Sequence, residues 1–279
     1  MKGLVIKKLS DKFRVNVQGE TVLAFARGNL KKQGVYVGDI IEYNPETKQI
    51  EAVFERKNKL VRPPICNLDN LFILLADTPK PDFLILDKLL LFCKVNDITP
   101  IICHSKTDEN NDILPYIHRV YGKYFKVIDT SAHKKIGISE IKYLLLNKVS
   151  AFAGQSGVGK SGLLNAIFGK DMTKEGGLSS KIERGKNTTR HTELYELSTN
   201  TYIADTAGFS ALDESYLPLT KAELPYYYPE FLEFLPNCKY KSCAHINEEV
   251  CGVKDALNAG KIDEGRYTRY IEIRTKLDK

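Results

Sequence analysis

The 279-residue sequence contains no apolar run long enough to cross a lipid bilayer. Its longest apolar stretches, at 71–76 and 89–93, are far shorter than the roughly 20 residues that a membrane-spanning helix requires. Residues 1–8 also lack the apolar segment of a secretory signal. Without an export signal, the six cysteines are expected in a reducing compartment, where thiols stay free or bind metal. These absences argue against a membrane protein or a secreted disulfide scaffold and predict a soluble cytoplasmic protein.

The positive charge of the chain is concentrated at one end. The sequence has 41 Lys and Arg against 35 Asp and Glu, a formal net charge of +6. Residues 1–64 hold 13 basic and 7 acidic residues, whereas 65–216 hold 18 of each and 217–279 hold 10 of each. A localised basic excess favours a polyanionic partner such as nucleic acid. On charge alone, a solvated basic surface is the alternative.

A glycine-rich segment at 154–161 carries the clearest chemical signal in the chain. It reads Gly-Gln-Ser-Gly-Val-Gly-Lys-Ser and fits the phosphate-binding loop, whose backbone N–H groups surround a diphosphate. We expect Lys160 to contact the β- and γ-phosphates and the Ser161 hydroxyl to bind magnesium. The predicted phosphate-binding residues are Gly154, Gln155, Ser156, Gly157, Val158, Gly159, Lys160, Ser161 and Gly162.

A candidate guanine-reading motif at 105–108, Ser-Lys-Thr-Asp, precedes this loop, which reverses the usual order. The Asp108 carboxylate can accept two hydrogen bonds from the imino and amino groups of guanine, whereas adenine presents no such pair. Lys106 would lay its methylene stem on the ring, and the Ala132 N–H would meet the guanine carbonyl. A switch-like segment at 205–209, Asp-Thr-Ala-Gly-Phe, ends the series. The predicted base-binding residues are Ser105, Lys106, Thr107, Asp108, Ser131 and Ala132.

Each of these motifs follows a strand-like apolar run. In an open α/β sheet the nucleotide lies beyond the carboxyl ends of the strands, so those ends must be adjacent but need no particular chain order. We therefore predict a circularly permuted α/β P-loop domain at 65–218, with a polar loop at 173–191. Four motifs at strand ends make a chance P-loop match the weaker interpretation. The expected strands are 101–103, 125–128, 149–152 and 202–204, with helices at 84–95 and 138–146.

Residues 1–64 have the pattern of short strands separated by turns. A five-stranded barrel of the oligonucleotide-binding (OB) kind fits this length and spacing, and an SH3-like barrel is the alternative. Phe13, Phe25 and Tyr36 are candidates either for stacking on unpaired bases or for core packing. The expected strands are 4–7, 13–17, 22–26, 35–43 and 50–54.

Residues 219–279 contain three cysteines and a histidine within a polar, turn-rich stretch. Three thiolates and one imidazole satisfy tetrahedral zinc and leave no position open for chemistry, so we predict one structural zinc ion per chain. Scattered buried cysteines are the alternative. The end of the chain, 256–277, is expected to be helical, with interruptions at Gly260 and Gly265. The predicted zinc ligands are Cys238, Cys243, His245 and Cys251.

A basic barrel, a permuted P-loop domain and a Cys-x4-Cys-x-His-x5-Cys module follow one another in this chain. In this order they resemble the RsgA (YjeQ/YloQ) family of circularly permuted ribosome-biogenesis GTPases, over nearly the whole length. Segment 184–191, Arg-Gly-Lys-Asn-Thr-Thr-Arg-His, resembles the switch segment of the family, and 260–270 resembles its C-terminal helix. The sequence departs from the family at Ser105, where Asn or Thr is usual, at Asn187, where His is common, and at Ala207, where Pro is usual.

The resemblance implies a GTPase that binds the small ribosomal subunit late in its maturation and is stimulated by it. We expect the Gly208 N–H to sense the γ-phosphate, and Thr189, with Thr188 as the alternative, to close over magnesium. Because Phe209 replaces the glutamine that orients water in many GTPases, unstimulated hydrolysis should be slow. His191 matches the proposed catalytic histidine of the family, although an idle loop histidine is an equal alternative. The predicted catalytic residues are Lys160, Thr189 and His191, and the predicted magnesium ligands are Ser161, Thr189 and Asp205.

Two other functional classes fit the sequence less well. An RNA-binding factor with a vestigial nucleotide site is disfavoured because Lys160 and Asp205 are intact, and a P-loop ATPase or kinase is disfavoured by the motif at 105–108. The expected cofactors are GTP or GDP, magnesium and zinc. The expected partners of this cytoplasmic monomer are the small ribosomal subunit, its rRNA and other assembly factors, without a membrane.

Overall fold

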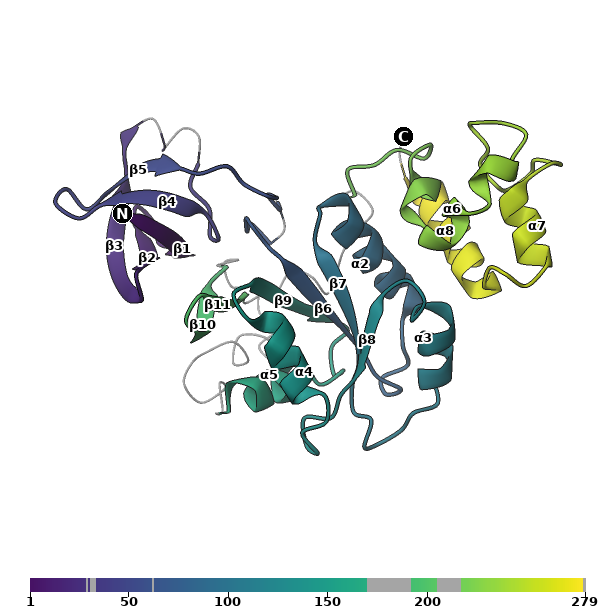
Figure 1. Ribbon diagram of the computed structural model, residues 1–279, viewed down its shortest axis with the longest axis horizontal. Coiled ribbons are helices and arrows are strands. Elements are labelled where there is room, and N and C mark those ends of the chain that lie inside the picture. The colour runs from purple at the N-terminus through teal and green to yellow at the C-terminus, as the bar shows by residue number, and fades with distance from the viewer. Residues whose placement is uncertain (29, 31–33, 62, 170–191, 205–216, 278–279) are drawn as a thin grey trace.

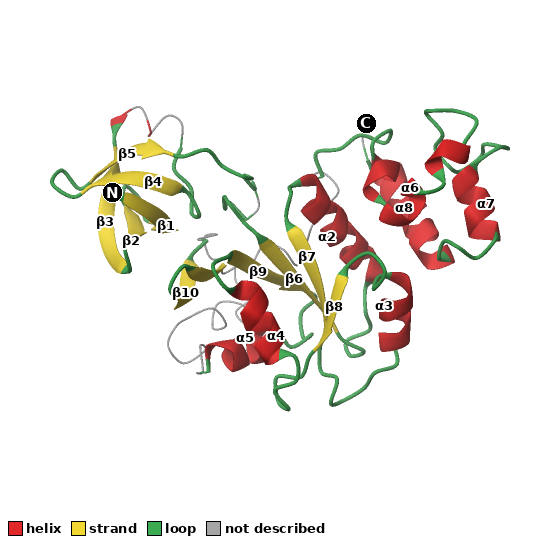
Figure 2. Ribbon diagram, viewed as in Figure 1, coloured by secondary structure: helices red, strands yellow, loops and turns green. Residues whose placement is uncertain are grey.

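The computed structural model describes residues 1–28, 30, 34–61, 63–169, 192–204 and 217–277. A β-barrel, a six-stranded sheet with helices on both faces and a small, mostly helical module follow one another along the chain (Figure 1). Figure 2 shows that strands dominate the first part and helices the last. The predicted multi-domain fold class is confirmed by these elements, whereas the boundaries after 64 and 218 stay predictions. Within the described part of the chain, no helix has the length and apolar character to span a membrane.

The N-terminal strands form a closed barrel in the order β1-β2-β3-β5-β4. β1 pairs antiparallel with both β2 and β4, and β3 runs parallel to β5. This Greek-key closure is that of an OB barrel and decides against the SH3-like alternative. Side chains that alternate inward, such as Val15, Ala24 and Ile41, fill the interior. The strands are β1 (Lys2–Lys8), β2 (Phe13–Val17), β3 (Glu20–Ala26), β4 (Ile40–Asn44) and β5 (Gln49–Val53).

The expected strand at 35–43 is wrong at its beginning, because β4 starts only at Ile40. Gly38 adopts a φ of +89°, and a Cβ atom there would lie 2.0 Å from the Cys66 carbonyl oxygen. The chain therefore turns at Gly38 and packs against the segment that leaves the barrel. Asn67 donates a hydrogen bond to the Gly38 carbonyl, and the Arg56 Nε lies 2.6 Å from the Asp39 carboxylate.

The central sheet has the strand order β10-β11-β9-β6-β7-β8. Only β10 and β11 pair antiparallel, and the other pairs are parallel. Every residue of β6 and β9 is buried, as expected for strands covered on both faces. The strands are β6 (Asn70–Leu75), β7 (Thr99–His104), β8 (Lys126–Asp129), β9 (Val149–Gly154), β10 (Leu194–Ser198) and β11 (Thr201–Ala204).

Helices cover the sheet on both sides, as Figure 1 shows. Helices α2 (Phe83–Val95) and α3 (Leu114–Val120) pack on one face, where their apolar side chains join the largest core cluster. Helices α4 (Ile138–Leu145) and α5 (Lys160–Phe168) pack on the other face around a second cluster. The helices and strands expected for this domain therefore form. All of its expected motifs within the described residues lie at the carboxyl ends of the parallel strands.

The C-terminal module packs on α2 through the largest core cluster, to which Tyr228, Phe231 and Tyr270 contribute buried rings. Gly260, with a φ of +69°, separates its last two helices as expected. The expected interruption at Gly265 is wrong, because this residue lies in the first turn of the last helix. The elements are η2 (Leu224–Tyr227), α6 (Pro229–Leu232), η3 (Leu235–Asn237), α7 (Gly252–Asn258) and α8 (Glu264–Lys276).

Candidate nucleotide site and metal centre

The glycine-rich loop connects the end of β9 to the beginning of α5. Gly154 has a φ of +140°, and a Cβ atom there would lie 2.4 Å from the Leu74 carbonyl oxygen, so only glycine fits. Gly159, with a φ of +93°, stands at the N-terminus of α5. Free N–H groups and the positive end of the helix dipole at this point suit a phosphate group. The local backbone is thus that of an anion-binding loop.

Lys160 bends back over the loop that precedes it. Its ammonium nitrogen lies 2.5 Å from the Gly154 carbonyl oxygen and 2.7 Å from that of Gln155. Burial lowers the pKa of Lys160 to about 8. A phosphate beside this ammonium would restore the preference for the charged form, because an opposite charge raises the pKa of a base.

Ser105 connects the candidate base motif to the phosphate loop. It follows β7 and is buried, and its hydroxyl lies 2.5 Å from the Val158 carbonyl oxygen and 2.9 Å from that of Leu75. These contacts fix the end of β7 against the phosphate loop and leave the hydroxyl directed at backbone. The Ser105 hydroxyl therefore connects the base motif to the phosphate loop.

The other residues of the base motif lie around this bridge. Lys106 has a φ of +61°, and its Cγ would lie 3.7 Å from a Cβ atom at Gly159. Thr107 donates from its backbone and its hydroxyl to the Thr130 carbonyl. A hydrogen bond from Ser131 lowers the pKa of Asp108. The carboxylate of this motif is thus held charged, as an acceptor for guanine must be.

The second base segment also reaches the phosphate loop. Ala132 lies beside the first turn of α5, because a Cβ atom at Gly162 would be 3.7 Å from that of Ala132. His133 follows, with its Nδ1 3.7 Å from the Asp108 carboxylate. The structure therefore brings 105–108, 131–132 and 154–162 together. The remaining predicted site residues, Thr188, Thr189, His191, Asp205 and Gly208, lie outside the described residues.

Sequence reasoning missed the loop between β6 and α2, which braces the phosphate loop from the other side. Gln155 accepts a hydrogen bond of 3.0 Å from the Asp82 N–H, and Asp82 caps α2. Pro79 lies 3.6 Å from the Cβ position of Gly157. The cluster of Asp and Pro after the apolar run at 71–76 was the available signal, because such residues mark a turn at a strand end.

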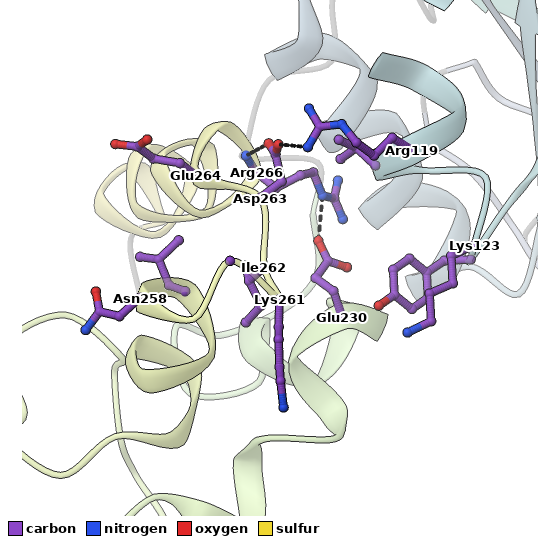
Figure 3. Close-up of a pocket in the computed structure, with 13 residues that line it drawn as sticks. Arg119, Lys123, Glu230, Asn258, Lys261, Ile262, Asp263, Glu264 and Arg266 are labelled. Atoms are coloured by element: carbon purple, nitrogen blue, oxygen red, sulfur yellow. Dashed lines mark hydrogen bonds and ion pairs between the residues drawn. The ribbon is translucent and has the colours of Figure 1, made fainter. Parts of the chain in front are cut away.

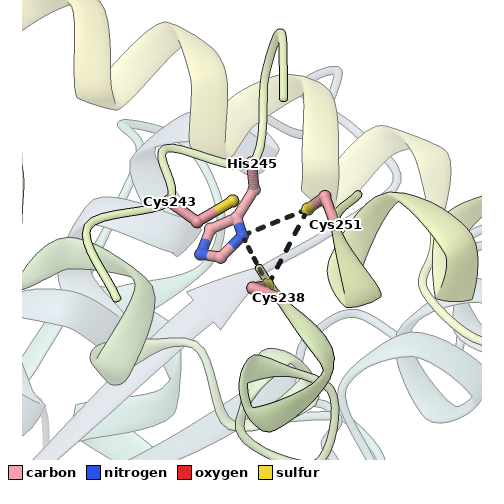
Figure 4. Close-up of side chains that lie close together, drawn as sticks. All are labelled: Cys238, Cys243, His245 and Cys251. Carbon is pink, nitrogen blue, oxygen red and sulfur yellow. Dashed lines mark hydrogen bonds between the residues drawn. The ribbon is translucent and has the colours of Figure 1, made fainter. Parts of the chain in front are cut away.

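The four predicted zinc ligands converge, as Figure 4 shows. Their ligand atoms all lie within 4.8 Å of one another. The His245 Nδ1 lies 3.3 Å from the Cys251 Sγ and 3.6 Å from the Cys238 Sγ. Zinc–ligand bonds of about 2.0–2.3 Å in a tetrahedron place the ligand atoms roughly 3.3–3.8 Å apart, so this group fits a zinc ion.

The protonation preferences of the cluster also suit a metal ligand set. Burial lowers the pKa of His245 to about 4, which favours the neutral imidazole that can bind a metal. Burial raises the pKa of the Cys243 thiol to about 12, so a metal must displace that proton when it binds. Together these preferences fit a buried site that releases protons on loading.

A second set of residues, which sequence reasoning missed, shapes the loop that carries His245. Glu248 accepts hydrogen bonds from the backbone N–H groups of Ala244 and Ile246, at 2.6 and 2.9 Å. The hydroxyl of Tyr267 donates to the His245 carbonyl at 2.6 Å. Such outer contacts orient metal ligands, and Tyr267 shows that α8 supports the cluster directly.

The opposite side of α8 is joined to α2 by a buried charge network. Arg266 Nη1 and Arg269 Nε each lie 2.6 Å from the Asp87 carboxylate, and Arg266 Nε lies 2.6 Å from Glu230. Tyr121 of the sheet domain also donates to Asp87. Figure 3 shows the Arg266–Glu230 pair at a cavity of about 670 Å³ between α3 and this module. The zinc module is therefore fastened to the nucleotide domain by desolvated ion pairs.

An OB barrel, a permuted P-loop sheet and a three-cysteine, one-histidine module define the class of circularly permuted GTPases. Residues 53–215 match the sequence model of the RsgA GTPase, and the chain belongs to the RsgA GTPase family. A "Small ribosomal subunit biogenesis GTPase RsgA" of Geobacillus kaustophilus is 41% identical over 281 residues, which cover 96% of this chain and 94% of the relative. The family resemblance drawn from the sequence is thereby confirmed.

Solved structures agree over the whole chain. YjeQ from Thermotoga maritima superimposes with a TM-score of 0.83 at 30% identity and covers 99% of this chain and 98% of its own. YloQ, described as a circularly permuted GTPase, gives a TM-score of 0.80 at 30% identity, with 98% and 93% covered. The similarity therefore extends over barrel, sheet and zinc module alike.

Proposed function

We propose that this chain is a GTP hydrolase that binds the small ribosomal subunit, assists or checks its late maturation and is stimulated by it. The observation that carries this proposal is the Ser105–Val158 contact of 2.5 Å, which joins a guanine-reading motif to a phosphate loop despite the permuted order. Membership of the RsgA GTPase family supports the reaction. The names of relatives, which include the small ribosomal subunit, support the partner.

Guanine selection is assigned to Asp108. Its carboxylate would accept the imino and amino hydrogens of the base, and the hydrogen bond from Ser131 that lowers its pKa favours that charged state. Lys106 would cover one face of the ring, and the Ala132 N–H would donate to the guanine carbonyl. Ser105 and Thr107 would hold the motif in place through their backbone contacts.

Phosphate binding is assigned to the loop at 154–162 and to Lys160. The backbone N–H groups and the Lys160 ammonium would contact the β- and γ-phosphates. Ser161, Thr189 and Asp205 are the residues that would hold magnesium, which neutralises charge on the transferred phosphoryl group when bound. Gly208 would contact the γ-phosphate through its N–H.

The catalytic assignment is His191, with Lys160 and Thr189 as electrostatic partners. Phe209 cannot orient a water molecule because a phenyl ring neither donates nor accepts a conventional hydrogen bond. An imidazole can do so, and its ordinary pKa near neutrality suits proton transfer. If another molecule must set the position of the His191 imidazole, GTP turnover without that molecule should be slow.

One zinc ion per chain is assigned to Cys238, Cys243, His245 and Cys251, whose ligand atoms fit a tetrahedral ion. Zinc would hold the loop between η3 and α7 closed and contribute folding free energy to the module. No chemistry is assigned to this ion, because four protein ligands leave no open position.

The barrel is the proposed rRNA-binding surface. Phe25 and Phe54 are 40% and 47% exposed, and the ammonium groups of Lys12 and Lys2 lie 5.8 and 5.7 Å from the centres of these rings. Exposed aromatic rings beside cations suit unpaired bases and their phosphates. Phe13, by contrast, is buried in the barrel. A cytoplasmic monomer remains our interpretation of the chain.

The test is GTP turnover by the purified chain with and without small ribosomal subunits, alongside Asp108→Asn. Ribosome preparations carry other GTPases, and this variant separates them, because an asparagine amide offers xanthine a donor where guanine needs an acceptor. We expect small subunits to accelerate GTP turnover by wild type and xanthosine triphosphate turnover by Asp108→Asn. Absence of acceleration in both pairs would contradict the proposed function.

A further inference from the structure

Strands β1 and β2 of the barrel contact the segment formed by Glu193 and β10. Lys7 of β1 forms a backbone bridge with Glu193. Thr192 and Leu194, on either side of Glu193, are 6% and 3% exposed. Residues 192–194 are thus held in place by the burial of Thr192 and Leu194, and Glu193 between them contacts the barrel.

Glu193 lies between two cations of the barrel. Its carboxylate is 2.5 Å from the Lys7 Nζ and 3.9 Å from Arg14 Nη1, and its side chain is 15% exposed. Lys7 and Arg14 are register partners on β1 and β2, so the rigid ladder presents both charges to one carboxylate. Hydrogen bonds between charged groups are stronger and more directional than neutral ones. The charge of Glu193 therefore determines how this end of the segment sits on the barrel.

A second contact, within β10, provides an internal comparison. Asn16 of β2 donates a hydrogen bond of 3.0 Å to the Glu196 carboxylate. The partners of Glu196 are neutral, the Asn16 amide and the Tyr202 hydroxyl, and the contact is three residues further along the chain than Glu193. A glutamine at 196 could keep this hydrogen bond through its side-chain oxygen, whereas a glutamine at 193 would lose two cationic partners.

We propose that Glu193, held by Lys7 and Arg14, is a positioning residue for GTP hydrolysis. The inference rests on the proposed function, in which the barrel seats on RNA and His191 acts at the transition state. Once the barrel is seated, the ion pair fixes the chain two residues after His191 relative to the RNA surface. Binding by the basic barrel and hydrolysis at the sheet are thereby coupled through one carboxylate.

The test is single-turnover and steady-state GTP hydrolysis by the full chain with saturating small subunits, comparing Glu193→Gln with Glu196→Gln. Since catalysis is sensitive to sub-ångström displacement of a catalytic group, we expect Glu193→Gln to lower the stimulated kcat by about tenfold. The KM for GTP, the affinity for GDP, the affinity for small subunits and the thermal midpoint should stay at wild-type values. Glu196→Gln should behave as wild type.

A charge exchange provides the rescue. Lys7→Glu alone should lower the stimulated kcat, and Lys7→Glu combined with Glu193→Lys should restore most of it, because the pair is re-formed with opposite polarity. Stimulated turnover of Glu193→Gln equal to wild type, or equal losses in both glutamine variants, would overturn the role of Glu193 alone. Raised unstimulated turnover in Glu193→Gln would also overturn it, since the contact would then restrain rather than position. Wild type that small subunits fail to stimulate would overturn the proposed function as well.

Discussion

The nucleotide domain contacts both the barrel and the C-terminal module, and the ion pairs at these two junctions differ in their exposure to solvent. At the barrel, Lys7 and Glu193 keep 22% and 15% of their side chains exposed. At the zinc module, Arg266 and Asp87 keep 4% and 0%. Partly exposed pairs contribute about 0–1 kcal/mol, whereas removing one partner of a buried pair costs about 3–5 kcal/mol. The ion pair at the barrel can therefore be removed at small cost in stability, whereas breaking the ion pairs at the C-terminal module is costly.

The buried junction also lies on a continuous route from the cysteine–histidine cluster to the phosphate loop. Tyr267 of α8 holds the loop that carries His245, and Arg266 and Arg269 of the same helix hold Asp87 of α2. The N-terminus of α2 is tied to Gln155 of the phosphate loop through Asp82. We expect α2 and α8 to behave as one body, because buried, hydrogen-bonded charges give little freedom to either helix.

Removing zinc should have the largest effect, because it loosens the C-terminal module that forms the buried junction. Cys251→Ser, or strong chelation, should release one zinc per chain and expose the amides of α7 and α8 to exchange. GDP binding should be largely kept, because Val158 of the phosphate loop and the helix after it pack in the second core cluster, which the described residues of the C-terminal module do not join. Metal analysis and hydrogen exchange measure these effects. Protein purified without chelator that contains no zinc would contradict the assignment.

Breaking the charge network directly should have the next largest effect. Asp87→Asn removes the counter-charge of Arg269 and one of the two counter-charges of the buried Arg266, which keeps Glu230. It should lower the free energy of unfolding by about 3–5 kcal/mol. Urea unfolding followed by circular dichroism measures this loss. A matched control is Asp69→Asn, a carboxylate 25% exposed beside Lys57 and Lys148. Equally small losses of unfolding free energy in both variants would show that the Asp87 network stabilises the protein no more than a partly exposed ion pair does.

The phosphate loop between the junctions should show a proton uptake of moderate size. Burial lowers the pKa of Lys160 to about 8, so at pH 8 about half of the free protein carries a neutral amine. Phosphate raises that pKa, and GDP binding at pH 8 should therefore take up about half a proton per site. The uptake should shrink as pH falls to 7, where the amine is already charged.

Calorimetry in buffers of different ionisation enthalpy measures this uptake. Lys160→Met should abolish it while leaving the protein folded. An uptake that is unchanged in Lys160→Met would assign the proton to another group.

The smallest effect is expected at the barrel junction. Lys7→Met should lower the free energy of unfolding by at most about 1 kcal/mol, and high salt should reduce the difference, because a partly exposed pair is partly screened. Asp87→Asn should show no comparable salt dependence. Urea unfolding at low and high salt makes the comparison. A salt-independent loss of several kcal/mol in Lys7→Met would show that both junctions are equally buried in solution.

Much of the architecture could be predicted because its signals are local. Strand ends carry the motifs, and the barrel strands alternate. β6 was not predicted, because its buried apolar run has no alternation and, unlike β9, no recognised nucleotide motif follows it. The strand expected at 35–43 failed because Val35 and Val37 are buried by packing, while Gly38 turns the chain.

The site was predictable where spacing encodes chemistry, and not where it depends on distant pairing. The phosphate loop follows a known spacing, and the predicted zinc ligands combine three cysteines and one histidine in a short polar stretch. Asp87 and Arg266 are 179 positions apart, and Lys7 and Glu193 are 186 apart, so no pattern in a single sequence joins them. Ser105 illustrates a third case: its position was predicted, but its contact with the Val158 carbonyl required the fold.

Small ribosomal subunits should stimulate GTP hydrolysis through the barrel side of the molecule. The most direct measurement is stimulated GTP turnover by the full chain and by Lys12→Ala combined with Phe25→Ala, which alters only the exposed barrel face. We predict stimulation of wild type that declines steeply with salt, because phosphate contacts release counterions. The double variant should lose that stimulation and keep its GDP affinity. Equal stimulation of both proteins at every salt concentration would contradict the account.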